Sequence, residues 1–173
     1  VTNGMSQYSR AEFNANSGLV VDINPERDFP GDPLAGVRLQ RQLEEAAFVA
    51  GGSNYHAPGQ RVEDLLAGRP STQFGVVQPS YKPGVKPTDL ADVLPAFVIE
   101  ALREALPVFG RQVPGYDHPD AVMTGVETRT SSPIRIRRGA DFQSVNTAGL
   151  YPAGEGAGYA GGILSAAVDG IKV

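Results

Sequence analysis

A cluster of glycines near the end of the sequence has the clearest chemical meaning. Residues 149–163 read Gly-Leu-Tyr-Pro-Ala-Gly-Glu-Gly-Ala-Gly-Tyr-Ala-Gly-Gly-Ile, and residues 164–168 then have the pattern of a helix. A short apolar strand, a glycine turn and a helix in this order let backbone N–H groups and a helix N-terminus hold a phosphate or another electron-rich ligand edge. The spacing Gly156-x-Gly158-x-x-Gly161 also matches the dinucleotide-binding fingerprint. We therefore expect a nucleotide site at this turn.

The position of the turn narrows that expectation. The sequence ends at Val173, whereas a dinucleotide-binding unit continues through a second strand to an acidic residue about 20 residues further on. The turn is thus expected to close a nucleotide-binding domain rather than open one. Gly154 and Gly156 let a ligand touch the main chain, and Glu155 between them can accept hydrogen bonds from a ribose or ribityl hydroxyl. The alternative is a tight turn in which the glycines serve packing alone.

The segment 124–133 is a second candidate site. Glu127 and Arg129 occupy alternate positions, so they would share one face of a strand, and the hydroxyls of Thr130 and Ser131 follow them. A buried arginine beside hydroxyl groups can bind a carboxylate or stabilise an anionic flavin. A Glu–Arg pair on one strand is equally typical of a surface ion pair. The spacing alone leaves both interpretations open.

The long connection 51–87 holds a third group of candidates. It contains two turn clusters, 67–72 and 78–84, each with one cation among hydroxyl groups. In the first cluster Arg69 and Ser71 could grip an anion or a carboxylate. Long connections of this kind are uncommon in compact domains unless they serve a function. An ordinary loop remains the alternative for each cluster.

Composition excludes several other classes of function. With two histidines, no cysteine and no His-x-x-x-His spacing, no metal site is expected. The net charge of −4 argues against binding nucleic acid or an anionic membrane, so Arg135, Arg137 and Arg138 are interpreted as a solvated face. No apolar run of ~18 residues can span a bilayer. The lack of cysteine and of a signal segment favours a cytoplasmic protein.

The elements that position these candidates follow from periodicity. Asp32 and Pro33 predict a helix start, and the helix should end at Gly51. A second apolar stripe, 90–109, predicts a short turn capped by Thr88, a main helix from Pro95, and a loosened end at Pro107. Strands are expected at four segments: 18–23, 121–126, 133–137 and 150–153.

Together these elements predict an α+β, or mixed α/β, fold. Strands from both ends of the chain are expected to pair as the remnant of a larger sheet. The expected division is residues 1–24 and 120–173 as parts of one domain, with residues 25–119 as a helical, loop-rich insertion. Such a remnant would expose a strand edge and apolar surface, which is a candidate surface for a homodimer.

The glycine-rich segment also carries a resemblance. Residues 149–163 and the following Ser165–Gly170 resemble the carboxyl-terminal signature of a family of FAD-dependent oxidoreductases, often described as NAD(FAD)-utilising dehydrogenases. The resemblance extends to residues 14–17, 68–72 and 124–133. It implies a partial FAD/NAD(P)-binding domain with an inserted substrate subdomain, and a small-molecule substrate. The unit that binds the ADP half of FAD would lie upstream of this chain.

The resemblance further implies roles for particular residues. Gly154 and Glu155 would meet the pyrophosphate–ribityl region of FAD, and the turn and helix start would face the pyrimidine edge of the isoalloxazine ring. Arg69, Ser71, Thr130 and Ser131 would lie on the substrate side, and Glu127 and Arg129 are the catalytic candidates. The residues expected to bind the cofactor are Gly154, Glu155, Gly156, Ala157, Gly158, Gly161, Gly162 and Ile163.

Three functional interpretations remain at this point. The first is a fragment of an FAD-dependent oxidoreductase that is inactive without the ADP-binding unit. The second is a non-enzymatic ligand- or partner-binding module with a structural glycine turn. The third is a phosphate-binding module that uses the glycine turn alone. None of them identifies the substrate or the electron acceptor.

Overall fold

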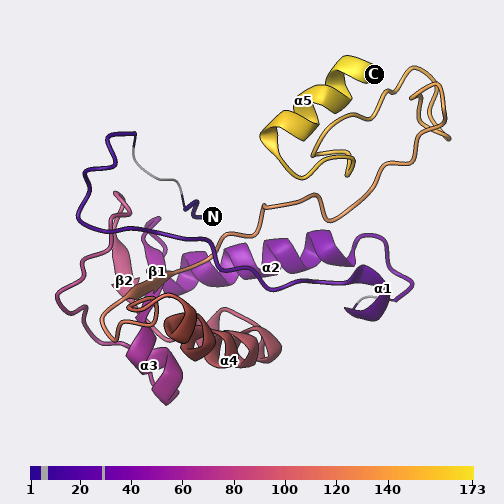
Figure 1. The fold of residues 1–173 in the computed structure, drawn as a ribbon. Coiled ribbons are helices and arrows are strands. Elements are labelled where there is room, and N and C mark those ends of the chain that lie inside the picture. The colour runs from indigo at the N-terminus through magenta and orange to yellow at the C-terminus, as the bar shows by residue number, and fades with distance from the viewer. Residues whose placement is uncertain (5–7, 29) are drawn as a thin grey trace. The chain divides into compact units, whose positions relative to one another are not determined.

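The structure is a computed structural model that describes residues 1–4, 8–28 and 30–173. The chain forms two compact units: unit 1 comprises Val1–Asp22 and Gln42–Thr128, and unit 2 comprises Ile23–Arg41 and Arg129–Val173. Helices and a small mixed sheet alternate along the chain, so the predicted α+β class is confirmed (Figure 1). The division at residues 24 and 119 concerns the domains of a longer protein and stays a prediction.

The sheet lies in unit 1 and has the strand order β2-β1-β3. The central strand β1 (Ala57–Arg61) pairs in parallel with β2 (Val85–Pro87) and antiparallel with β3 (Val122–Thr124). The strand predicted at 121–126 is thus confirmed as β3. The prediction that strands from both chain ends pair is wrong, because two of the three strands come from the middle of the chain.

The middle strands lack an apolar alternation, so sequence periodicity did not find them. Gly59 in β1 is needed because a Cβ there would collide with the side chain of Val85 on the neighbouring strand. Gln60 is fully buried, and its amide donates to the Arg69 carbonyl at 2.8 Å while its Oε1 accepts from the Leu90 N–H at 3.0 Å. The strand β1 is therefore held by its backbone pairing and by this buried amide, and not by an alternation of apolar side chains.

The two long helices follow the predicted patterns. Helix α2 runs over Ala35–Ala50, and α4 runs over Ala96–Gln112 directly after Pro95. Between them lie the short helix α3 (Val62–Ala67) and the 3-10 turn η1 (Leu90–Asp92).

Two details of the second pattern are corrected. The cap of η1 is Asp89, whose carboxylate accepts from the Ala91 N–H, whereas the Thr88 hydroxyl donates to the Gly59 carbonyl. Helix α4 also continues through Pro107: Leu102 and Leu106 before the proline are buried, and after it the Phe109 ring packs edge-on against the Tyr116 ring, with the ring centres 5.5 Å apart.

The core of unit 1 joins these helices to the sheet. One cluster of buried side chains comes from α3, η1 and α4: Val62, Leu65, Leu90, Ile99, Leu102 and Leu106. A second cluster joins α2 to the end of the sheet through Ala47, Val93 and Val126. The apolar stripes of α2 and α4 therefore serve packing, as their periodicity predicts.

Unit 2 is mostly irregular. It contains α1 (Pro25–Asp28) and ends in α5 (Ile163–Lys172), which confirms the helix predicted after the glycine turn. The strands predicted at 133–137 and 150–153 are not formed in the described residues of this unit, where a single isolated bridge joins Arg138 to Ser144. The reason lies in the hydrogen bonds of this region, which connect the 132–138 segment to the glycine turn rather than to a partner strand.

Candidate functional site

The glycine turn forms a closed loop in front of α5. Gly154 and Gly158 have φ values of +69° and +81°, in the region that favours glycine. The Gly158 N–H donates to the Glu155 carbonyl at 2.9 Å, and the Tyr159 N–H donates to the Gly154 carbonyl at 3.0 Å. A Cβ at Gly158 would also lie 2.6 Å from the Ile134 carbonyl oxygen. Gly154 and Gly158 are therefore explained by the turn itself.

Gly156 and Gly161 are different. Neither has a positive φ, and a Cβ built at either position would meet no atom of the described residues within 4 Å apart from its chain neighbours. Both residues are exposed at the surface of the turn. Backbone strain and internal packing, the two usual reasons for a glycine, do not apply to them in this structure. Packing within the described residues therefore does not explain these two glycines, and both leave open space beside the main chain. The alternative of a purely structural turn stays open.

The N-terminus of α5 follows Gly161 directly, and the turn residue Gly154 lies against the first turn of this helix, where a Cβ built on it would be 3.6 Å from the Ala166 Cβ. The helix begins at Ile163 after the extended Gly162, and its first hydrogen bond runs from the Ala166 N–H to the Gly162 carbonyl at 2.9 Å. The N–H groups of residues 163–165 consequently have no acceptor within the helix. Ile163 and Leu164 are 90% and 81% exposed. The helix start thus presents free donors and a partial positive charge at the surface.

An ion pair holds α5 against the turn. The Arg138 guanidinium and the Asp169 carboxylate form a two-point contact, with N–O distances of 2.6 and 2.9 Å. Arg138 also donates to the Pro152 carbonyl at 2.7 Å, and Asp169 accepts from the Gly154 N–H at 2.8 Å. The guanidinium carbon lies 3.8 Å from the centre of the Tyr159 ring. These contacts fix the helix start relative to the turn.

The pair corrects one expectation about charge. The Arg138 side chain is only 10% exposed, so the sequence interpretation of Arg138 as part of a solvated face is wrong. Its hydrogen bonds to Asp169, followed by the bond from the Gly154 N–H, lower the pKa of the Asp169 carboxyl to about 2. The pairing of Arg138 with Asp169 could not be predicted from the sequence, because the two residues are 31 positions apart and nothing in the spacing connects them.

The catalytic candidates Glu127 and Arg129 lie on different compact units. β3 ends at Thr124, so the strand face that these residues were expected to share does not extend to them. Glu127 is exposed on unit 1, where the neighbouring Val126 carbonyl accepts a hydrogen bond from the Thr2 N–H at 2.8 Å. Arg129, Thr130 and Ser131 are exposed on unit 2. Their catalytic and substrate roles stay predictions.

Arg69 and Ser71 belong to a polar network after α3. Gly68 ends this helix with a φ of +69°, and the chain then returns so that Arg69 and Ser71 both contact Asp64, at 2.6 and 2.7 Å. The Ser71 hydroxyl also accepts from the Arg61 N–H at 2.9 Å and is buried. Burial acts to raise the pKa of Asp64, but the hydrogen bonds from Ser71 and Arg69 outweigh it and lower the pKa.

Within this network Arg69 and Ser71 differ in their exposure to solvent. The Ser71 hydroxyl is used inside the protein, whereas the Arg69 side chain is 59% exposed. Of the two, Arg69 has a cationic group within reach of a ligand. Substrate contact by either residue stays a prediction.

No group of three or more His, Cys, Asp or Glu side chains lies in a position to hold a metal ion among residues 1–4, 8–28 and 30–173. None of the helices in these ranges is both long and apolar enough to cross a membrane.

Comparison with known proteins gives a family. The family model "FAD-dependent protein, C-terminal domain-like" matches residues 1–130 of the 173 residues. The chain belongs to this family. A protein of Clostridium beijerinckii, described only as uncharacterised, is 53% identical over 174 residues, which cover all of this chain and 32% of the relative. The chain thus spans about a third of the length of that relative.

The family match and the glycine turn cover different parts of the chain. The matched residues 1–130 contain all of unit 1, and they end before the turn at 154–163. The family match therefore shows that the chain is part of an FAD-related protein, and it does not bear on the glycine turn. The geometry of the turn is the independent observation that bears on where the cofactor would be held.

Proposed function

We propose that this chain is part of an FAD-dependent oxidoreductase in which the glycine turn and the N-terminus of α5 hold the flavin end of FAD. The observation that carries this proposal is the open space at Gly156 and Gly161 beside the free N–H groups of the helix start. A planar ring can approach a main chain closely only where no Cβ intervenes. The residues present therefore fit a flavin edge that accepts hydrogen bonds.

The polarity of this surface suits the pyrimidine edge of a flavin. The N–H groups of residues 163–165 would donate to its oxygen and nitrogen atoms, and the positive end of the α5 dipole would favour negative charge there. FAD, when bound, supplies the hydride or electron transfer. The contribution of this chain is to orient the ring and to stabilise charge at the edge that the helix start faces.

Glu155 would bind the ribityl part of the cofactor, which leads away from the flavin ring. Its side chain is half-buried between Gly154 and Gly156, and no described residue hydrogen-bonds to its carboxylate. A carboxylate in this position can accept hydrogen bonds from ribityl hydroxyls. Gly154 is buried, its N–H donates to Asp169 and its carbonyl accepts from the Tyr159 N–H, so it would shape the turn that places Glu155.

The rest of the reaction would need other parts of the protein. The ADP half of FAD would be bound outside this chain, so we do not expect the chain alone to be active. The Arg69 side chain, which is 59% exposed and paired with Asp64, is a candidate for contact with a carboxylate or another anion on a small-molecule substrate. Glu127, Arg129, Thr130 and Ser131 are exposed and remain candidates for contact with that substrate.

The experiment is a spectrum of the purified full-length protein that contains this chain. We expect the visible absorbance bands of a flavin, and release of FAD, identified by its mass, in a ratio of about one per chain after denaturation. A full-length protein that purifies colourless and takes up no added FAD would contradict the proposal. Release of FMN instead of FAD would contradict the part that assigns an ADP-binding unit to the remaining chain.

A further inference from the structure

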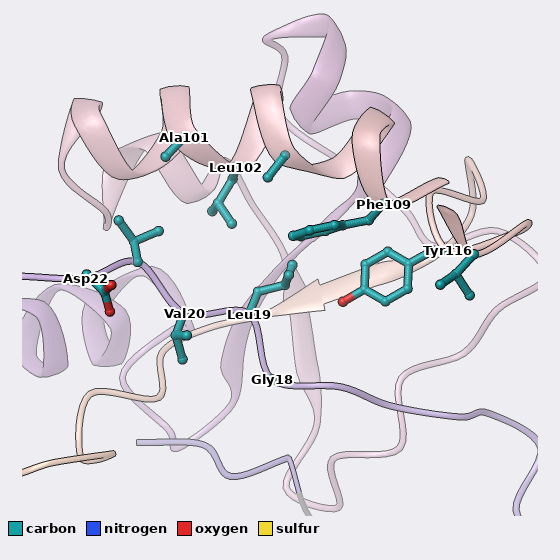
Figure 2. A pocket seen from close by; sticks show the side chains of 11 residues that line it. Gly18, Leu19, Val20, Asp22, Ala101, Leu102, Phe109 and Tyr116 are labelled. Carbon is teal, nitrogen blue, oxygen red and sulfur yellow. The ribbon is translucent and has the colours of Figure 1, made fainter. Parts of the chain in front are cut away.

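The segment Gly18–Asp22 has the conformation of a strand but no partner. Figure 2 shows it beside α4, with Leu19 pointing toward the helix and Val20 pointing away. Leu19 and Val21 pack against the buried cluster of α3, η1 and α4, whereas Val20 is 70% exposed. This inward–outward alternation is the period of a β-strand, which is why the sequence predicts a strand here. The prediction is wrong for the chain taken alone, because the structure contains no ladder at this segment.

The main chain of this segment is unpaired. No N–H or carbonyl of residues 18–22 takes part in a hydrogen bond with any described residue. The segment is nevertheless held at its beginning, where the Ser17 hydroxyl lies 2.8 Å from the Tyr116 hydroxyl and the Asn14 amide donates to the Gln78 carbonyl at 2.6 Å. A strand fixed by its inner side chains with free backbone groups is a template for another strand.

The surface beside the segment can also bury the side chains of an added strand. An apolar groove with a volume of ≈ 470 Å³ lies between Gly18–Asp22 and α4 (Figure 2). The small side chains of Ala101 and Ala105 leave room in it, and Phe109 adds an aromatic ring to its lining. Side chains that alternate along an added strand could enter this groove, so pairing would gain apolar burial as well as hydrogen bonds.

We propose that Gly18–Asp22 is a docking strand, to which a strand from another part of the full-length protein adds through backbone hydrogen bonds. The chain matches its Clostridium beijerinckii relative along its whole length and yet covers only 32% of it, so most of such a protein lies outside the matched segment. A strand of the same polypeptide is present at an effective concentration on the order of millimolar, which favours it over a second copy. This inference concerns assembly of the protein and does not depend on the flavin site.

Residue-resolved hydrogen exchange of the full-length protein tests the proposal. At least every second amide of residues 19–22 is expected to exchange about 100-fold more slowly than an unstructured amide, as a strand ladder requires. The exposed segment around Phe13 serves as the internal reference for fast exchange. Exchange of residues 19–22 at the reference rate, while the amides of β1 stay protected, would overturn the proposal.

A pair of substitutions separates pairing from side-chain effects. Val20→Pro removes one N–H from the strand, whereas Val20→Thr keeps the N–H and the branched side chain. Only the proline variant is expected to lose protection at its neighbours. If protection in the unaltered protein disappears on dilution together with a dimer seen by light scattering, the partner is a second copy and the proposed occupant is wrong.

Discussion

Gly161→Val in the full-length protein is expected to lower flavin occupancy by about tenfold or more while the fold is retained. The Cβ of a valine at this position meets no atom within 4 Å among the described residues beyond its chain neighbours, and the backbone φ here is not in the region that requires glycine. Its side chain would instead fill the space that we assign to the flavin edge. Gly156→Val is expected to act in the same way, for the same reason. The measurement is the ratio of flavin to protein absorbance after purification.

The matched control is Gly170→Val. Gly170 lies on α5, is exposed, and also has open space around a Cβ, but it is near the far end of the helix. Valine has a higher helix propensity than glycine, so this variant should keep both its fold and its flavin. Full flavin occupancy in Gly161→Val and Gly156→Val would show that the space beside the turn is not where the cofactor lies.

Asp169→Asn is expected to loosen α5 from the glycine turn and to remove the acid sensitivity of this contact. In the unaltered protein the pKa of Asp169 is lowered from 3.8 to about 2, chiefly by the hydrogen bonds from Arg138. A lowered pKa means that the contact stabilises the folded unit fully above pH 3.8 and that this contribution is lost as the pH falls toward 2. Asparagine has no such titration. We expect the amides of α5 in the variant to exchange about tenfold faster near neutral pH.

The control for this prediction is Asp141→Asn, which neutralises an exposed carboxylate of the same unit. Hydrogen exchange of the α5 amides is followed between pH 5 and pH 2, after correction for the intrinsic pH dependence of exchange. The unaltered protein and the Asp141 variant should lose protection over this range, whereas the Asp169 variant should start with less protection and change little. Equal protection of α5 in all three proteins would contradict the anchoring role of the ion pair.

The helices and the glycine turn could be predicted because their signals are local. The apolar stripe of α4 and the proline at its start define that helix within one segment of sequence, and α5 follows directly from the residues after the turn. The spacing of the glycines also predicts a ligand site, which stays a prediction. The structure adds a distinction that spacing does not contain: Gly154 and Gly158 shape the turn, whereas Gly156 and Gly161 leave space.

The features that escaped prediction depend on contacts between distant residues. β1 and β2 have no apolar alternation, since pairing and the buried amide of Gln60 hold them. Arg138 has the pattern of a solvent-facing residue and is buried because Asp169 meets it from α5. The segment at 18–22 shows the opposite case: its pattern predicts a strand, and the structure shows the conformation without the pairing. A partner outside this chain would reconcile the two.

The most direct test of the account is a crystal structure of the full-length protein with FAD bound. The account predicts that the N–H groups at the start of α5 lie roughly 2.7–3.2 Å from the acceptor atoms of the isoalloxazine pyrimidine edge. It also predicts that the ring passes over Gly156 and Gly161 and that the Glu155 carboxylate faces the ribityl hydroxyls. A flavin held entirely by other parts of the protein, with the turn at 154–163 packed against protein atoms, would contradict it.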